Sequence, residues 1–235
     1  MSGHSKWSTI KHKKAANDKV KGSVFTKMAK GITIAVKKGG GVADPDMNFS
    51  LRLAIDKARS VNMPKENIDR AIDKGMGKGE AELIELTLEG FAPQGVAMMI
   101  EAVTDSSNRT ISEMRLLIEK HGGTMGVPGS VAHLFERCGV VHFEGTITDD
   151  DELMLIDKGL TDLEQEQGVG VVYTSPTSFM KVVEAMKVLN LENVEGVLGY
   201  RPKILSTPED PDKVREFLEL ISEADDVQEV YAALA

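Results

Sequence analysis

The spacing of apolar residues changes once along the chain, close to residue 75. Before this point, apolar residues recur every three or four positions, as they do on one face of an α-helix. From residue 82 onward, stretches with helical spacing alternate with stretches in which every second residue is apolar, the pattern of a half-buried strand. This change predicts an all-helical unit followed by α+β structure.

The segment at the change, Gly75-Met76-Gly77-Lys78-Gly79, is rich in glycine. It follows a predicted helix rather than a strand, and it lacks the Lys-Ser or Lys-Thr ending of a phosphate-binding loop. We therefore predict a flexible linker between domains here.

Three short amphipathic helices are predicted before this linker. The first covers residues 23–38, with Ser23 as its N-cap and Gly39 just beyond its end. The second covers about 47–61, and Pro64 separates it from the third. Helices of this length joined by short loops predict a small bundle. Its expected inward-facing residues are Phe25, Met28, Ala29, Ile32, Val36, Leu51, Ile55, Ala58, Ile68, Ala71 and Ile72.

The first strand beyond the linker is predicted over residues 82–89. A turn at 93–95 leads to a second strand at 96–103, which is apolar on both faces and therefore central. The alternation in the first strand predicts that Ile84, Leu86 and Leu88 face inward and that Glu85, Thr87 and Glu89 face outward.

A helix is predicted next, over residues 108–121. Thr110 and Glu113 have the spacing of a capping box, which places Asn108, Arg109 and Thr110 near the start of this helix. Simple capping is the main interpretation of these three residues. A phosphate contact is the alternative, because backbone N–H groups at a helix start attract anions.

Residues 133–203 show the order strand, helix, strand, strand, helix, strand, which is typical of a ferredoxin-like unit. We expect a turn at Cys138-Gly139 to break the first of these strands. A further helix at 208–223 and a strand at 227–232 follow.

Charge is divided unequally along the chain. Residues 1–79 contain 17 Lys and Arg against 7 Asp and Glu, whereas residues 80–235 contain 11 against 30. The first 38 residues alone contain ten Lys and one acid, with one Trp on which a base can stack. This composition favours contact with a polyanion, although a solvated chain end is the alternative. The residues predicted to bind nucleic acid are Lys6, Trp7, Lys11, His12, Lys13, Lys14, Lys19, Lys21, Lys27 and Lys30.

Motifs for catalysis or metal binding are not recognisable. The sequence has neither a Gly-x-Ser-x-Gly nor a His-Glu-x-x-His motif, and no histidine has metal-ligand spacing with Cys138. We therefore expect no enzymatic activity, metal, cofactor or small-molecule substrate. One cysteine and the lack of a long apolar run lead us to expect a cytoplasmic protein without a membrane partner.

Several motifs resemble those of the YebC family of bacterial gene-expression regulators, which has a mitochondrial relative that activates translation of cytochrome c oxidase. The opening Gly3-His4-Ser5-Lys6-Trp7 resembles the start of the family. Further blocks agree at 48–67, at Leu88–Gly95, at Thr104–Thr110 and at 122–131, in the order of the family. The match runs nearly end to end.

This resemblance implies an α+β fold of three domains, with a ferredoxin-like domain inserted into the second. The expected divisions are a basic N-terminal arm at 1–22, a basic three-helix bundle at 23–79, an α+β domain at 80–132 plus 204–235, and the inserted ferredoxin-like domain at 133–203.

The expected function is non-enzymatic regulation of gene expression through nucleic acid. The family's usual label implies DNA, whereas its mitochondrial member and its ribosome-linked bacterial members imply RNA and translation. The sequence leans slightly toward RNA, because no basic helix has a helix-turn-helix partner. Ribosomal RNA or the ribosome as the partner is what the resemblance implies. A DNA-binding transcriptional regulator and a protein-binding scaffold that uses the acidic domains remain the alternatives. The oligomeric state is not predicted.

Overall fold

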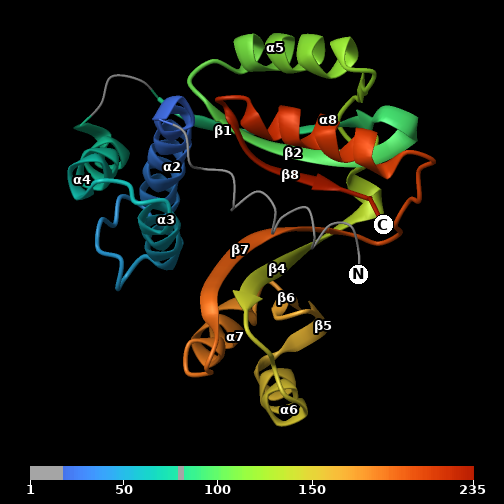
Figure 1. The fold of residues 1–235 in the computed structure, drawn as a ribbon. Helices are drawn as coiled ribbons and strands as arrows, with labels where there is room; N and C mark the ends of the chain where they lie inside the picture. Colours follow the sequence, from blue (N-terminus) through green and yellow to red (C-terminus); the bar gives the residue numbers. More distant parts are fainter. Residues whose placement is uncertain (1–17, 79–81) are drawn as a thin grey trace.

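The computed structural model describes residues 18–78 and 82–235 and has an α+β architecture, as predicted (Figure 1). Three groups of elements are visible: a helical group, a sheet with two helices above it, and a second sheet with two helices of its own. Both sheets have four strands, and all the strand pairs within them are antiparallel.

The N-terminal group is the predicted three-helix bundle. It consists of α2 (Asp18–Lys38), α3 (Phe49–Ser60) and α4 (Lys65–Asp73), and a π-helical turn (Lys74–Lys78) continues α4. The Asn48 side chain accepts a hydrogen bond from the backbone N–H of Leu51, which caps α3, and donates to the carbonyl of Ala35 in α2. The core consists of Ile32, Ala35, Val36, Leu51, Ile55, Ala58, Met63, Ile68 and Ala71.

Two local predictions in the bundle are wrong. Helix α2 begins at Asp18, so Ser23 lies inside the helix and is not its N-cap. The expected flexible linker begins with a packed residue, because a Cβ on Gly75 would lie only 2.6 Å from Cβ of Val36. Gly75 therefore allows α4 and α2 to approach closely. Residues 79–81 lie outside the described residues.

The first sheet has the strand order β3-β1-β2-β8. Its strands are β1 (Ile84–Ala92), β2 (Val96–Thr104), β3 (Thr124–Met125) and β8 (Val227–Ala232). The helices α5 (Ser107–Lys120) and α8 (Pro211–Glu223) cover one face of it (Figure 1). The core between the sheet and these helices includes Leu88, Met98, Ile100, Met114, Ile118, Val214, Phe217, Leu218 and Ile221.

The second sheet has the order β5-β6-β4-β7, the ferredoxin-like arrangement. Its strands are β4 (Phe135–Glu144), β5 (Leu160–Glu166), β6 (Val169–Thr174) and β7 (Glu192–Pro202). Its helices are α6 (Asp149–Lys158) and α7 (Phe179–Met186). The chain leaves the first sheet after β3, builds the second sheet, and returns with α8 and β8.

The expected break at Cys138-Gly139 is also wrong, because both residues lie in the continuous strand β4 and pair with β7. A side chain on Gly139 would collide with the ring of Phe179, so this glycine makes room for α7. Cys138 is buried, and burial raises the pKa of its thiol to about 11. The thiol therefore stays protonated at neutral pH.

Candidate nucleic-acid interface

Six of the predicted contacts lie outside the described residues: Lys6, Trp7, Lys11, His12, Lys13 and Lys14. The backbone of Lys19 and Lys21 belongs to the first turn of α2, and the side chains are described from Ser23 onward. The structure therefore places directly only Lys27 and Lys30 of the predicted basic set.

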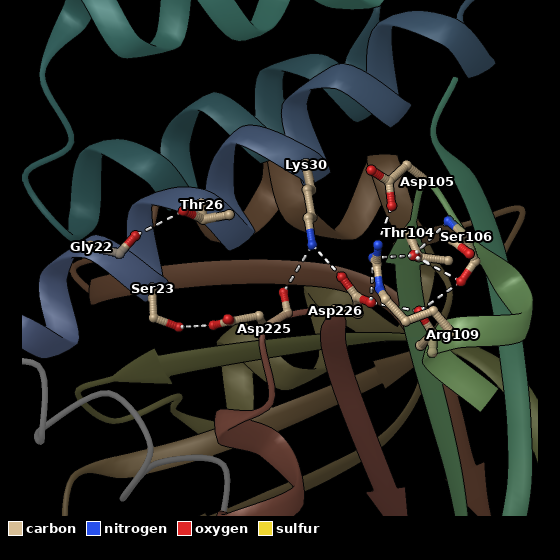
Figure 2. A network of polar contacts seen from close by, with 11 residues as sticks. Gly22, Ser23, Thr26, Lys30, Thr104, Asp105, Ser106, Arg109, Asp225 and Asp226 are labelled. Atoms are coloured by element: carbon tan, nitrogen blue, oxygen red, sulfur yellow. Dashed lines mark hydrogen bonds and ion pairs between the residues drawn. The ribbon is translucent and has the colours of Figure 1, made fainter. Parts of the chain in front are cut away.

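Helix α2 directs one polar stripe toward residues 222–226, which are the end of α8 and the turn that leads to β8. This segment is called the α8–β8 turn below. Ser23, Lys27 and Lys30 follow one another at spacings of four and three residues, so they lie on the same face of the helix. Ser23 Oγ donates to a carboxylate oxygen of Asp225 at 2.8 Å, and Lys27 Nζ donates to a backbone carbonyl of the turn. Figure 2 shows this approach of α2 to the turn. Both lysines, Lys27 and Lys30, were predicted to contact nucleic acid, and in this structure they contact the α8–β8 turn.

Asp226 accepts hydrogen bonds from three side chains on two different helices (Figure 2). Lys30 Nζ lies 2.5 Å from Oδ1, while Thr110 Oγ1 and an Arg109 Nη donate to Oδ2 at 2.5 and 3.4 Å. The same Arg109 nitrogen donates to Asp105 at 2.8 Å. Burial raises the pKa of the Asp226 carboxyl, but Lys30, Thr110 and Arg109 together hold it below its ordinary value.

The start of α5 differs from the predicted capping box. Its N-cap is Ser106, and Thr110 lies inside the first turn, where it is buried and bonded to Asp226. Arg109 is half exposed and engaged with carboxylates, and Asn108 is exposed. The capping-box prediction is wrong because tertiary partners, which the local sequence does not reveal, determine the role of Thr110.

A second set of charges joins α3 to the first sheet. Lys57 Nζ forms an ion pair with Glu229 on β8, and Glu229 lies directly opposite Glu101 on β2. Tyr231 donates its hydroxyl to Glu101 at 3.1 Å. Burial and the neighbouring Glu229 raise the pKa of the Glu101 carboxyl, despite the hydrogen bond from Tyr231.

Few apolar residues support this junction between the bundle and the first sheet. Ile34 on α2 forms a small buried cluster with Leu83 and Val103. On the other side, Phe49 of α3 contacts Phe179 of the second sheet's unit edge to face, with ring centroids 5.9 Å apart. The bundle therefore touches both sheet units, and its contact with the first is mainly polar.

Glu89 is a buried carboxylate whose side chain was wrongly predicted to face outward. The predicted outward side chain is only 8 % exposed, and it accepts hydrogen bonds from the backbone N–H groups of Gly129, Val131 and Ala132 at 2.6–2.8 Å. Burial raises the pKa of the carboxyl, but the three N–H donors lower it by a larger amount, so the pKa lies below its ordinary value. Glu89 thus anchors the loop that leads into β4.

The groove beside Arg201 is a weaker candidate for an anion site. Its guanidinium lies over the Tyr173 ring, 4.0 Å from the centroid, and forms ion pairs with Asp162 and Glu164. Two carboxylates already surround this cation, and Glu136 also lines the groove. The local charge therefore does not favour a phosphate.

Metal and membrane sites were also sought in the described ranges 18–78 and 82–235. Within them, no three His, Cys, Asp or Glu side chains gather in a way that could hold a metal ion. Within the same ranges, none of the helices has the length and apolar character needed to cross a membrane.

A helical N-terminal unit followed by two antiparallel α+β units, one of them ferredoxin-like, defines the class of this protein. Residues 5–78 match the family model for the TACO1/YebC protein N-terminal domain, and residues 83–234 match the model for the TACO1/YebC second and third domain. The chain therefore belongs to the TACO1/YebC family, as the sequence motifs indicated.

Similar full-length proteins support this assignment. The chain is 44 % identical to a probable transcriptional regulatory protein of Thermoanaerobacter pseudethanolicus, over 98 % of this chain and 96 % of the relative. It is 43 % identical to a protein of the same name from Latilactobacillus sakei, over 99 % and 97 %. The crystal structure of a conserved hypothetical protein from Aquifex aeolicus matches with a TM-score of 0.84 and 38 % identity, over 96 % of this chain and 95 % of that one.

Proposed function

We propose that the protein is a non-enzymatic regulator of gene expression that binds nucleic acid through its N-terminal basic segment. The division of charge carries this proposal: residues 1–79 have ten more cations than anions, whereas residues 80–235 have nineteen more anions than cations. A polyanion is repelled by the second part, so contact is confined to the first. The names of the relatives, probable transcriptional regulatory proteins, support a regulatory role.

The junction described above narrows the set of available cations. Lys27, Lys30 and Lys57 contact acidic or carbonyl oxygens of α8, of β8 and of the turn between them. The cations that precede them, from Lys6 to Lys21, therefore form the primary contact with phosphate. Trp7 lies among these lysines, where its indole can stack on a base.

RNA on the ribosome is the nucleic acid that we favour, with the protein acting in the cytoplasm on translation. Helix α4 carries three acids, Glu66, Asp69 and Asp73, against two cations, so its charge does not suit insertion into a DNA groove. A basic segment with one tryptophan suits irregular RNA, whose unpaired bases are open to stacking. Duplex DNA remains the second candidate because of the names of the relatives.

The test is binding of the full chain to ribosomal RNA and to duplex DNA of equal length, titrated with salt. We expect the logarithm of the association constant to fall with log salt at a slope of about −4 to −5, because about six phosphates are neutralised. Tighter binding to ribosomal RNA, together with RNase-sensitive sedimentation with ribosomes, supports the translational role. Equal, salt-independent retention on both polymers contradicts nucleic-acid binding and favours the protein scaffold.

A further inference from the structure

The contacts of Asp226 resemble those of a bound phosphate. An ammonium group from Lys30, a guanidinium group from Arg109 and a hydroxyl group from Thr110 converge on one carboxylate. Cations with a hydroxyl are the donors that proteins present to phosphate oxygens, and charge-assisted hydrogen bonds of this kind are strong. The three donors that bind the Asp226 carboxylate are therefore equally suited to bind a phosphate oxygen of a nucleic-acid backbone.

Few apolar contacts stabilise the junction between α2 and the α8–β8 turn, which holds this carboxylate in place. Among the residues that the structure describes, the buried apolar cluster at this junction consists of Ile34, Leu83 and Val103. The Gln228 side chain lies beside Gly31 of α2, and its buried Nε2 has no hydrogen-bond partner among the described residues. A buried donor without a partner costs free energy. When the junction opens, water or a ligand can bond to this donor, which offsets part of the free energy lost with the contacts of the junction. Polar contacts between units permit relative movement.

The position of α2 connects this junction to the basic segment. The helix begins at Asp18, directly after the lysine-rich stretch, and it places Lys30 about 14 Å along its axis from Lys21. A strand of nucleic acid held by the preceding lysines therefore lies within reach of the polar stripe of α2. Its phosphates then compete with Asp226 for the same cations.

We propose that Lys27, Lys30 and Arg109 form a second phosphate-binding surface, covered in this structure by the α8–β8 turn as an internal substitute for nucleic acid. This inference rests on the proposed function of the basic segment. Binding of phosphate displaces the turn, so the bundle separates from β8 when nucleic acid is held along α2. The coupling is reciprocal: a weaker junction means tighter binding of nucleic acid.

The first test replaces Asp226 by Asn, which removes the competing charge and keeps the size of the side chain. We expect about tenfold tighter binding of a 20-nucleotide poly(U) RNA with the salt slope little changed, because the same cations meet phosphates in both complexes and the variant only lacks the competing carboxylate. The matched control is Asp212→Asn, which removes an exposed carboxylate on α8 outside the junction. The control should change affinity less than twofold. Weaker or unchanged binding by folded Asp226→Asn protein overturns the proposal.

A second test uses the unaltered chain, so it does not depend on the folding of a variant. Hydrogen exchange of the amides at 222–229 is measured with and without the poly(U) RNA, and with a 20-base-pair DNA duplex. We expect at least threefold faster exchange at these amides when nucleic acid is bound, with little change in β4 and β6. Unchanged or slower exchange at 222–229 in a saturated complex shows that the junction stays closed and overturns the proposal.

Failure of this inference is distinguishable from failure of the proposed function. If the basic segment binds nucleic acid but the junction does not open, the affinity depends on Lys11, Lys13 and Lys14 and is unaffected by Asp226→Asn. If the proposed function itself is wrong, substitution of those three lysines leaves binding unchanged as well. If the junction does open, the comparison of hydrogen exchange with RNA and with DNA shows which of the two backbones opens it.

Discussion

The first sheet's unit holds two buried carboxylates in different ways, one at its junction with the basic bundle and one in its interior. At the junction with the bundle, Asp226 accepts from side chains of two separate helices, one of them in another unit of the fold. Inside the sheet unit, Glu89 accepts from three backbone N–H groups of a nearby loop. Side-chain cations can exchange one anion for another, whereas backbone donors at fixed positions cannot move to another ligand.

This difference indicates which charges are available for function. Lys38–Glu85 and Lys57–Glu229 are further ion pairs between the bundle and the first sheet, and partly exposed pairs of this kind contribute little and weaken with salt. The contacts of Glu89 are enclosed and determine a loop conformation. We therefore expect changes in the basic half to alter binding, and changes at Glu89 to alter stability.

The largest expected effect tests the basic half. Changing Lys11, Lys13 and Lys14 to Glu removes three cations and adds three repulsions, so binding to RNA should be lost near physiological salt and the salt slope should flatten by about three units. The measurement is a salt titration of binding, with thermal unfolding as the control for folding. Binding equal to that of the unaltered protein would show that the segment is a passive tail.

The second prediction tests the other side of the comparison. Glu89→Gln leaves the N–H groups of Gly129, Val131 and Ala132 facing an amide that cannot accept at both positions, which should lower the free energy of unfolding by about 3 kcal/mol. The measurement is urea unfolding, with the exposed Glu113→Gln as a matched control. RNA affinity should not change in either variant. A loss of affinity without a loss of stability would mean that Glu89 belongs to the binding surface.

A smaller effect is expected for Trp7→Ala. Loss of one stacked base should weaken binding to single-stranded RNA by about 1–3 kcal/mol while the salt slope stays the same, because stacking releases no counterions. Binding to duplex DNA, whose bases are already stacked, serves as the control. An altered slope with unaltered affinity at low salt would argue that Trp7 acts by positioning the lysines.

The smallest effect concerns pH. The carboxyls of Asp226 and Glu89 have pKa values below their ordinary values in the folded protein, so both bind protons more weakly there than in the unfolded chain. Their stabilising contribution is complete above the pKa of an unfolded carboxyl, about 4, and is lost as the pH falls through the lower folded value. Thermal unfolding from pH 7 to pH 3 should show a decline below about pH 4. Glu89→Gln and Asp226→Asn should each make that decline shallower, and an unchanged profile in both would contradict these assignments.

Much of the fold follows from apolar spacing. The three helices of the bundle, the inward positions of Leu51, Ile55 and Ala58, and the ferredoxin-like order of elements were all predicted correctly. Two of the errors fell at single residues where glycine has a packing role. Gly75 and Gly139 suggest a linker and a turn by composition, yet each allows a neighbouring element to approach closely.

The candidate site, like the fold, was predicted only in part from the sequence. The sequence alone determined the helical and strand periods, the separation of charge and the family, because each depends on residue types and short spacings. Only the tertiary structure decided that Lys30 meets Asp226, 196 residues later, and that Glu89 lies buried under a loop. A period shows which face of an element is apolar, but it does not identify the partner across that face. Partners depend on how the chain brings distant elements together, and the cost of burying an unpaired charge then determines which ones are kept.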